Sequence, residues 1–386
     1  MKNNWQTKKL GEVCKLIKGK KPSKFVSKSS KPYLTAKVVR GTEIPEFAAE
    51  NCPSSVWVKK DDIVIIMDGS NSGEMFTQLE GALASTMGIV KYHENLLNPR
   101  FLLHFLITHR ESFTKSRTGS AIPHLNKEEF ENLEIPLPPL SEQHRIVKIL
   151  DEVFEKTAKA KDNAEKNLQN AKDLFKSYSQ NVFANKGSDW EEKKLGQILE
   201  IERGGSPRPI QKYLTNEANG INWIKIGDTK NVDKYIYETA QKIKPEGLKK
   251  SRLVNAGDFI LSNSMSFGRP YIMKTTGAIH DGWLVLREKN INIIDKDYLY
   301  NILNSPYVFN QFDKLAAGST VRNLNISLVS SVKIPLPTIS EQKTIVAKLD
   351  ALSAETKKLE KIYIQKLADL EELKKSVLKR AFDGEL

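Results

Sequence analysis

The sequence has few cysteines and no long apolar segment. Only Cys14 and Cys52 are present among 386 residues, which excludes a disulfide framework and a four-cysteine zinc site. No apolar run approaches the ~18 residues of a membrane-spanning helix. The opening MKNNWQTKKLGEV lacks the apolar core of a signal peptide. These absences predict a protein of the reducing cytoplasm that does not cross a membrane.

Sequence signatures of catalysis are also missing. The chain has no GxxxxGK[ST] phosphate loop, no GxGxxG and no Asn-Pro-Pro-aromatic tetrapeptide of the kind found in adenine methyltransferases. Its six histidines show neither metal-ligand spacing nor a nucleophile elbow. Asp233, Glu238 and Lys242 superficially suggest a metal nuclease, but such scattered sets are common in solvated segments. We therefore expect no catalytic residue, no metal site and no cofactor in this chain. Its expected role is to bind and position other molecules.

Positive charge is in excess. With 60 Lys and Arg against 47 Asp and Glu, the formal net charge is +13. Such a balance favours an anionic partner, with nucleic acid first and a membrane surface second. The alternative is a lysine-rich composition without a binding role.

Two motifs occur twice. Residues 135–154 (IPLPPLSEQHRIVKILDEVF) recur as 334–353 (IPLPTISEQKTIVAKLDALS), with eleven of twenty positions identical at an offset of 199. Upstream, WQTKKLG at 5–11 recurs as WEEKKLG at 190–196. The distance from the Trp to the IPLP motif is 130 residues in the first copy and 144 in the second. The repeat predicts two related domains with a common frame and a divergent middle.

The repeat divides the chain into four predicted segments. Short apolar runs such as Ile63–Ile66 and Phe259–Leu261, separated by Gly, Ser and Asn, predict strands in matching positions of two globular units. Long helical patterns follow each unit, with Ser141 and Ser340 as predicted N-caps. We expect an α+β fold with target-binding domains at 1–140 and 187–339 and long helices within 141–186 and 340–386.

The apolar residues of both helical segments recur in steps of four and three, as a two-helix seam requires. Small residues in the first helix face large ones in the second, which favours pairing of the two helices with each other rather than with their own domains. Because the first helix leads directly into the second globular unit, we expect an antiparallel coiled coil of roughly 60 Å with one unit at each end. The predicted seam consists of Ile146, Leu150, Val153, Leu174, Ile345, Leu349, Leu352, Leu359, Tyr363 and Leu373.

Basic and polar loops occupy matching places in the two units. The turn KGKKPSK at 18–24 has RGGSPR at 203–208 as its counterpart, and the strand exits carry DGSNSG at 68–73 and SNSMSFGR at 262–269. Such loops supply cations for phosphates and polar groups for base edges, although plain solvated turns have similar sequences. Arg269 is the strongest single candidate. The predicted DNA-binding residues are Lys20, Lys21, Lys24, Ser70, Asn71, Arg117, Ser120, Arg203, Arg208, Ser264, Ser266, Arg269, Arg322 and Asn323.

Over its whole length the chain resembles the specificity subunit of type I restriction–modification systems. The resemblance rests on the WxxKKLG starts, GGSP at 204–207, WIKIGD at 223–228, AIHDGW at 278–283 and both IPLPxxSEQ helices. The first unit departs from the pattern, with GKKP at 19–22 in place of a GGTP-like turn.

The resemblance implies that two target recognition domains read the halves of a split, asymmetric DNA sequence. It also implies that the helices dock two methyltransferase subunits, and that restriction and translocase subunits join them. S-adenosylmethionine, ATP and magnesium would then belong to those partner subunits. The alternatives are a specificity component of another methylation-based defence system, a stand-alone DNA-binding regulator and a nuclease with an unrecognised active site.

If the helices act as a ruler, deleting one heptad from each should shorten the rod by ~10 Å. This length corresponds to about three base pairs at ~3.4 Å each. Methylation mapping in a host that carries the shortened protein should show a correspondingly shorter spacer between the two half-sites. An unchanged spacer would refute the ruler.

Overall fold

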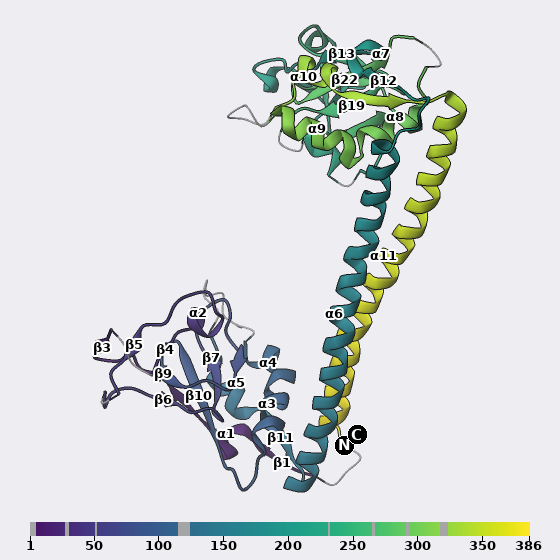
Figure 1. The fold of residues 1–386 in the computed structure, drawn as a ribbon. Coiled ribbons are helices and arrows are strands. Elements are labelled where there is room, and N and C mark those ends of the chain that lie inside the picture. Colours follow the sequence, from purple (N-terminus) through teal and green to yellow (C-terminus); the bar gives the residue numbers. More distant parts are fainter. Residues whose placement is uncertain are drawn as a thin grey trace. The chain divides into compact units, whose positions relative to one another are not determined.

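The computed structural model describes residues 5–27, 31–50, 52–114, 124–230, 232–264, 267–290, 293–316 and 323–386. The chain forms two compact units (Figure 1), which we name unit 1 (Met1–Glu165 with Gln365–Leu386) and unit 2 (Lys166–Ile364). Both units contain parts of the two long helices. Within the described ranges, no helix is long and apolar enough to cross a membrane.

The two repeated motifs pair with each other. In unit 1, β1 (Gln6–Lys9) lies antiparallel to β11 (Glu134–Leu137), with Thr7 opposite Pro136. In unit 2, β12 (Glu191–Lys194) pairs with β23 (Lys333–Leu336) in the same register, with Glu192 opposite Pro335. The WxxKKLG start and the IPLP end of each repeat are therefore the two strands of one small sheet that closes the globular part.

Unit 1 is built on a four-stranded sheet in the order β2-β10-β7-β8, with smaller sheets β4-β9-β6 and β3-β5 beside it. Its core lies between the larger sheet and the helices. The strands are β2 (Cys14–Lys18), β3 (Phe25–Val26), β4 (Tyr33–Leu34), β5 (Phe47–Ala48), β6 (Trp57–Val58), β7 (Ile63–Ile66), β8 (Met75–Phe76), β9 (Gly81–Leu83) and β10 (Met87–Tyr92). The shorter helices are α1 (Leu10–Val13), α2 (Ala36–Val39), α3 (Pro99–Thr108), α4 (Arg110–Thr114) and α5 (Lys127–Asn132).

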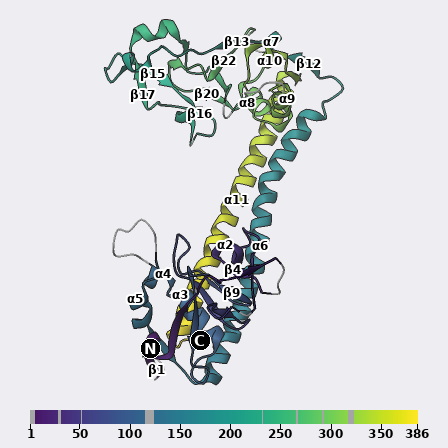
Figure 2. The ribbon, with the colours of Figure 1, turned by 90° about the vertical axis from the view of Figure 1, so that its left-hand side faces the viewer.

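Unit 2 has two five-stranded sheets, in the orders β13-β22-β19-β20-β16 and β14-β17-β15-β21-β18. Figure 2 shows β15 and β17 at the left of this unit, with β13 and β22 nearer its middle. The strands are β13 (Leu199–Arg203), β14 (Leu214–Thr215), β15 (Ile221–Ile224), β16 (Tyr235–Ile236), β17 (Gln241–Ile243), β18 (Arg252–Val254), β19 (Phe259–Ser262), β20 (Pro270–Met273), β21 (Gly277–Ile279) and β22 (Trp283–Glu288). The helices are α7 (Leu195–Ile198), α8 (Lys296–Leu303), α9 (Pro306–Ala316), α10 (Ile326–Ser331) and the 3-10 turns η1 (Ile210–Lys212), η2 (Ile226–Thr229) and η3 (Pro245–Lys250).

The central strands of the two units share one register. Ile66 of β7 faces Met87 of β10, and Ser262 of β19 faces Trp283 of β22, an offset of 196 in both strands. Strand β7 has the predicted bounds, and Phe259–Leu261 lies within β19 as expected. The units differ most in the second sheet, which gains strands β14 and β17 in unit 2. Eleven of the fourteen additional residues of the second copy lie between the glycine turn and the central strands, where the offset rises from 185 to 196, and the other three lie between the central strands and the IPLP motif.

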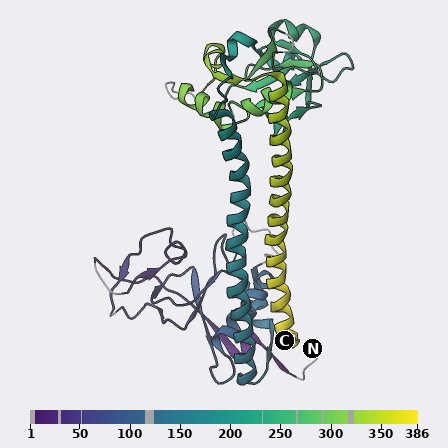
Figure 3. The same ribbon diagram turned by 45° about the vertical axis from the view of Figure 1, so that its right-hand side comes forward.

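Two long helices complete the fold, α6 (Leu140–Ala184) and α11 (Ile339–Phe382). Figures 1 and 3 show them side by side. In unit 1, Lys161 of α6 donates to Glu371 of α11 over 2.8 Å, and the ammonium of Lys374 lies 5.0 Å from the ring centroid of Phe154. Lys161 comes after Phe154 in α6, whereas its partner Glu371 comes before Lys374 in α11. The helices therefore run antiparallel, as expected.

The last turns of both helices are buried in globular cores. The ring of Phe382, at the end of α11, lies 5.1 Å from that of Phe101 and 5.3 Å from that of Phe105 in unit 1. In unit 2, Phe183 near the end of α6 lies 5.7 Å from Tyr298. Edge-to-face aromatic pairs of this kind add to the stabilisation from apolar burial. Phe183 and Phe382 are 199 residues apart, so the same position of each repeat has the same role.

The start of α11 corrects the predicted N-cap. The helix begins at Ile339, and the hydroxyl of Thr338 accepts from the backbone N–H of Glu341 over 3.4 Å. The Glu341 carboxylate in turn accepts from the N–H of Thr338 over 3.0 Å. These reciprocal bonds form a capping box. The cap is therefore Thr338, two residues before Ser340, and α6 likewise begins before Ser141.

The predicted seam is only partly buried. Ile146, Leu150 and Leu349 are at most 1% exposed, whereas Leu174, Leu359 and Leu373 are 50%, 37% and 46% exposed. The prediction is wrong for these last three. A strict heptad drifts about 20° per repeat relative to a straight helix. The residues of the predicted seam that are half-buried are Val153, Ile345, Leu352 and Tyr363.

The buried row of α6 departs from the heptad after Ala164. It passes through Ala171 and then Phe175 and Ser179, one position later than the predicted Leu174. From the half-buried Leu168 through Ala171 and Phe175 to Ser179, the steps of three, four and four give about 3.67 residues per turn, close to the period of an unsupercoiled helix. The shift exposes Leu174 and Tyr178 and brings Phe175 against the core of unit 2.

The glutamine of each SEQ motif joins a long helix to its globular unit. Gln143 is fully buried; its amide nitrogen donates to the carbonyls of Leu96 and Pro138, and its oxygen accepts from the N–H of Asn98. Gln342 forms the same three bonds with Ile293, Pro337 and Asp295. The bonds fix the first turn of each helix against the loop before α3 or α8.

Replacing Gln143 with alanine should destabilise unit 1 by at least about 2 kcal/mol, because three backbone groups lose a buried partner that costs ~1–3 kcal/mol each to leave unpaired. Urea unfolding of the full chain measures the effect. The control is Gln169→Ala on the exposed face of α6, which should stay within about 0.5 kcal/mol of the parent. Equal loss in both variants would contradict the role of Gln143.

Candidate nucleic-acid interface

In each unit a glycine turn packs against the loop that precedes a central strand. A Cβ added at Gly204 would lie 2.2 Å from the carbonyl oxygen of His280, and one at Gly19 would lie 2.2 Å from that of Ala84. The N–H of Gly204 donates to Trp283, and that of Gly19 donates to Met87. Only glycine fits so close an approach. The basic turn and the loop before β10 or β22 are thereby held together in both units.

Asp281 lies at the centre of the resulting cluster in unit 2. Its carboxylate accepts a hydrogen bond of 2.7 Å from the Ser206 hydroxyl and forms an ion pair of 3.6 Å with Arg208. Its backbone carbonyl accepts from the Arg203 side chain over 3.1 Å and from the buried amide of Asn263 over 3.0 Å. Loops from three separate parts of the sequence therefore converge on one residue.

The electrostatics of this cluster favour an ionised acid. The hydrogen bond from Ser206 holds the pKa of Asp281 below its usual value, against the opposing effect of partial burial. The neighbouring His280 has a pKa lowered by burial, and its Nδ1 accepts from the N–H of Gly282 over 2.8 Å. At neutral pH the cluster presents one carboxylate among the cations of the turn.

Unit 1 builds a different cluster on the same frame. Asp68, just after β7, accepts from Lys18 over 3.1 Å and meets Nδ1 of His124 at 2.9 Å. Partial burial alone would raise the pKa of Asp68, but the hydrogen bonds from His124 and Lys18 lower it. Asp68 and His124 also form an isolated β-bridge, so both backbone and side chains join the strand exit to the segment before α5.

The described candidates for DNA binding lie on these loops. Lys20, Lys21 and Lys24 are exposed on the turn after β2, and Ser70 and Asn71 follow β7. In unit 2, Arg203 and Arg208 are exposed on the turn after β13, and Ser264 and Arg269 flank the loop between β19 and β20. Asn323 precedes α10, and its Oδ1 is buried without a hydrogen-bond partner. Four further candidates lie outside the described residues: Arg117, Ser120, Ser266 and Arg322.

Sequence reasoning missed the acidic members of both clusters. Asp68 and Asp281 were not among the candidates, because cations, amides and hydroxyls are the groups expected to contact phosphates and base edges. The hydroxyl of Ser206, which donates to Asp281, was not a candidate either. The signal for the two acids lay in the sequence, since Asp68 begins the DGSNSG loop and Asp281 lies in the AIHDGW run. Convergence of these segments on the basic turns required the fold.

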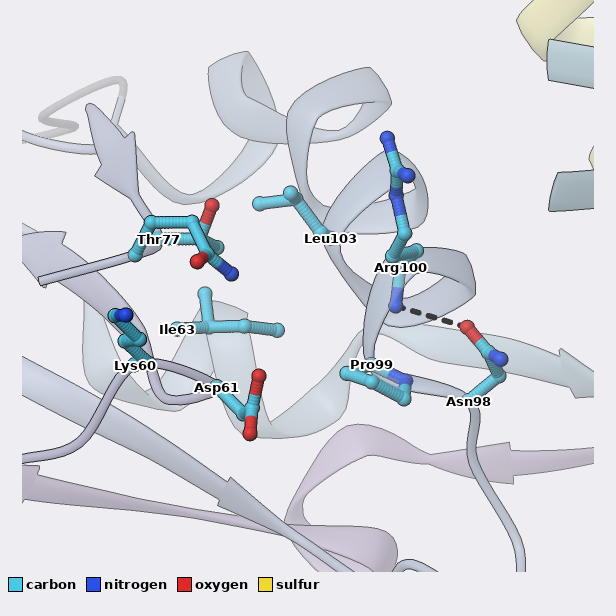
Figure 4. A pocket seen from close by; sticks show the side chains of 9 residues that line it. Lys60, Asp61, Ile63, Thr77, Asn98, Pro99, Arg100 and Leu103 are labelled. Carbon is cyan, nitrogen blue, oxygen red and sulfur yellow. Dashed lines mark hydrogen bonds between the residues drawn. The ribbon is translucent and has the colours of Figure 1, made fainter. Parts of the chain in front are cut away.

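Unit 1 has a hollow of about 510 Å³ (Figure 4). Its lining residues come from other parts of the sequence than the predicted DNA-binding loops. Ile63 and Leu103 give it an apolar wall, and Lys60, Asp61 and Arg100 supply charges. The N–H of Arg100 donates to the Asn98 side chain at the start of α3. Among the predicted DNA-binding residues that the structure describes, none lines this hollow. Among the described residues, no three His, Cys, Asp or Glu side chains are grouped as metal ligands would be.

The sequence matches the family model of the type I restriction modification DNA specificity domain twice, over residues 2–169 and 187–369. It is 30% identical to the MjaVIII type I restriction enzyme specificity subunit of Methanocaldococcus jannaschii, over 94% of this chain and 90% of that protein. It is 22% identical to the EcoBI specificity subunit of Escherichia coli, over 100% of this chain and 86% of that protein.

Two solved structures share the fold. One comes from work on complex assembly and conformational transition of the type I R-M system; it has a TM-score of 0.79, 21% identity and coverage of 99% of this chain and 98% of that chain. The other is the HsdS subunit from Thermoanaerobacter tengcongensis, with a TM-score of 0.64, 20% identity and coverage of 100% of this chain and 98% of that chain.

Proposed function

This chain belongs to the family of the type I restriction modification DNA specificity domain, and on that premise we propose that it is the DNA-reading subunit of a type I restriction–modification complex. Each unit reads one half of a bipartite, asymmetric target. The observation that carries the proposal is the convergence, in both units, of a glycine turn rich in cations with two polar loops at the ends of the central strands.

The two units are suited to unlike half-sites. Their strands share a register and their turns share the same close approach, yet the side chains on the loops differ. Lys20 and Lys21 of unit 1 have Gly205 and Ser206 as counterparts in unit 2. Phosphate contacts orient a protein on DNA, whereas side chains at base edges select the sequence. A common frame with exchanged side chains therefore gives two readers with different preferences.

The chemistry belongs to partner subunits in this proposal. The chain itself is non-catalytic, methyltransferase subunits bind S-adenosylmethionine, and restriction and translocase subunits use ATP and magnesium. We place the protein in the cytoplasm, where its DNA target lies. The absence of phosphate-loop and methyltransferase motifs from the sequence supports this division of labour.

The long helices offer a docking surface for the methyltransferase subunits. In unit 2, Leu174 and Tyr178 are 50% and 36% exposed one turn apart on α6, and Leu359 and Ile362 are 37% and 50% exposed one turn apart on α11. Neighbouring exposed apolar side chains on otherwise charged helices are typical of an interface. The same helices of unit 1 expose Leu373. Leu174, Leu359 and Leu373 were expected in the seam, and their exposure makes them available to a partner.

Selection from a pool of randomised DNA duplexes tests the reading function. The purified full-length chain, with its methyltransferase subunits, should enrich one bipartite sequence with two unlike halves and a fixed spacer. Replacing Lys20, Lys21 and Lys24 together with alanine should weaken binding to all sequences. It should also reduce the slope of log affinity against log salt by about three, because each phosphate contact contributes about one.

Matched controls separate this effect from net charge. Alanine at the exposed helix residues Lys156, Lys172 and Lys176 removes the same charge and should leave the salt slope nearly unchanged. Enrichment of no sequence would refute the proposal. Enrichment of a single uninterrupted site by a chain that binds no methyltransferase would favour a stand-alone regulator.

The docking surface has its own test. Serine at both Leu174 and Tyr178 should weaken association with the methyltransferase subunit by roughly tenfold or more, because burial of each apolar side chain contributes about 1.5–3 kcal/mol. Titration calorimetry with the purified partner measures the change. Lys172→Ser, on the same helix, should bind as the parent does. Unaltered affinity of the double variant would place the interface elsewhere.

A further inference from the structure

The two units carry a carboxylate at different places on the same frame. Asp68 follows β7 in unit 1, and the equivalent position after β19 in unit 2 is Ser264. Asp281 precedes β22 in unit 2, and the equivalent position before β10 in unit 1 is Ser85. The partners of Asp281 are exchanged as well, since Ser206 and Arg208 correspond to Lys21 and Ser23. The cluster around Asp281 is thus a property of one reader alone.

The frame does not require the Asp281 side chain. Its backbone carbonyl accepts from Arg203 and Asn263, and those bonds would persist with another side chain at this position. Of the carboxylate oxygens, Oδ1 accepts from Ser206 at 2.7 Å, while Oδ2 lies 3.6 Å from Arg208, too far for a hydrogen bond. A carboxylate accepts about four hydrogen bonds. The hydrogen bond from Ser206 to Oδ1 thus orients the carboxylate. Oδ2 retains the capacity to accept a hydrogen bond from a ligand.

Arg208 complements this acceptor. Its side chain is 82% exposed and the Asp281 side chain is 44% exposed, so both can reach a ligand that approaches the loops. In the major groove a G·C pair presents two acceptors on guanine and one amino donor on cytosine. An arginine beside a carboxylate presents the matching arrangement of donors and acceptors. No other base pair offers that pattern at the same edge.

We propose that Arg208 and Asp281 together read one G·C base pair in the half-site of unit 2, with Arg208 donating to guanine O6 and N7 and Asp281 accepting from the cytosine N4 amino group. The inference rests on the proposed DNA-reading function and names a specificity pair within it. Asp281 also disfavours binding to DNA that has another base pair at this position. Where thymine replaces cytosine, its O4 acceptor faces a carboxylate that has nothing to donate, and two facing acceptors without a proton between them disfavour binding.

The Asp281 carboxylate weakens non-specific binding to DNA, which supports a role in discriminating between base pairs. A negative side chain beside a basic turn reduces attraction to phosphates, and Asp281 lies at a position where the other unit has serine. Without a donor on the DNA, an acid there would only weaken binding. With one, the same acid converts general affinity into preference for one base pair.

The test is Asp281→Asn in the full-length chain with its methyltransferase subunits, analysed by selection from a pool of randomised DNA duplexes. Asparagine keeps the shape and can still accept from Ser206, so the variant should unfold at the same temperature as the parent. It should lose roughly tenfold to a hundredfold of its preference for G·C at a single position of one half-site. All other positions of the recognised sequence should remain as in the parent.

The matched control is Asp68→Asn, which removes the acid of unit 1 and should leave the half-site of unit 2 unchanged. A uniform loss of affinity for all sequences in Asp281→Asn would assign Asp281 a structural role and overturn the proposal, as would an unchanged preference at every position. A parent protein that enriches no sequence would instead refute the DNA-reading function itself. The two failures are therefore distinguishable in one experiment.

Discussion

Burial of the ends of the long helices is the constraint on which the rest of the structure depends. A helix of 45 residues with a charged surface has little reason to hold a fixed position unless its apolar ends are captured. Phe382 is captured between Phe101 and Phe105 in unit 1, and Phe183 against Tyr298 in unit 2. Each globular core is thus completed by the helix of the other repeat, and neither repeat forms a complete core from its own residues.

The buried glutamines fix the orientation of the long helices. Aromatic packing alone permits rotation of a helix about its axis, because dispersion contacts have little angular preference. Gln143 and Gln342 each make three hydrogen bonds with fixed geometry to backbone groups, so the first turn of each helix has one orientation. The paired WxxKKLG and IPLP strands lie immediately before these turns. Packing, hydrogen bonds and strand pairing together produce the constant frame of both units.

The two units differ in their second sheets and in the loops that this frame holds. Gly19 and Gly204 bring the basic turns against the loop before β10 or β22, where the side chains of the two units differ. The carboxylates of Asp68 and Asp281 lie at different places on the common frame and have different partners. In a chain with a net charge of +13, attraction to DNA is abundant, and selectivity requires groups that oppose binding to the wrong sequence.

Much of the fold could be predicted because the repeated motifs are local. Strands β7 and β19 and the two long helices follow from apolar runs and periodicity within short segments, and the repeat transfers each inference between the units. Seam positions far from the helix starts were harder to predict. Leu174 fits a heptad but is exposed, because α6 follows a longer period after Ala164 and Phe175 turns towards the core of unit 2. Leu359 and Leu373 of α11 also fit a heptad and are exposed. The position of a helix cap also depends on where the chain leaves the preceding strand. For this reason the cap of α11 is Thr338 and not the predicted Ser340.

The sequence by itself determined that this protein has two related units, a pair of long helices, a basic surface and a resemblance to a specificity subunit. Those features are written in repeats, periodicity and composition, which need no long-range contacts. Only the tertiary structure decided which loops meet. Arg208, Asn263 and Asp281 are far apart in the sequence, and they become neighbours because β13, β22 and β19 are adjacent in one sheet. Strand order is set by packing of the whole domain, so the chemistry at the ends of the strands appears only once the sheet has formed.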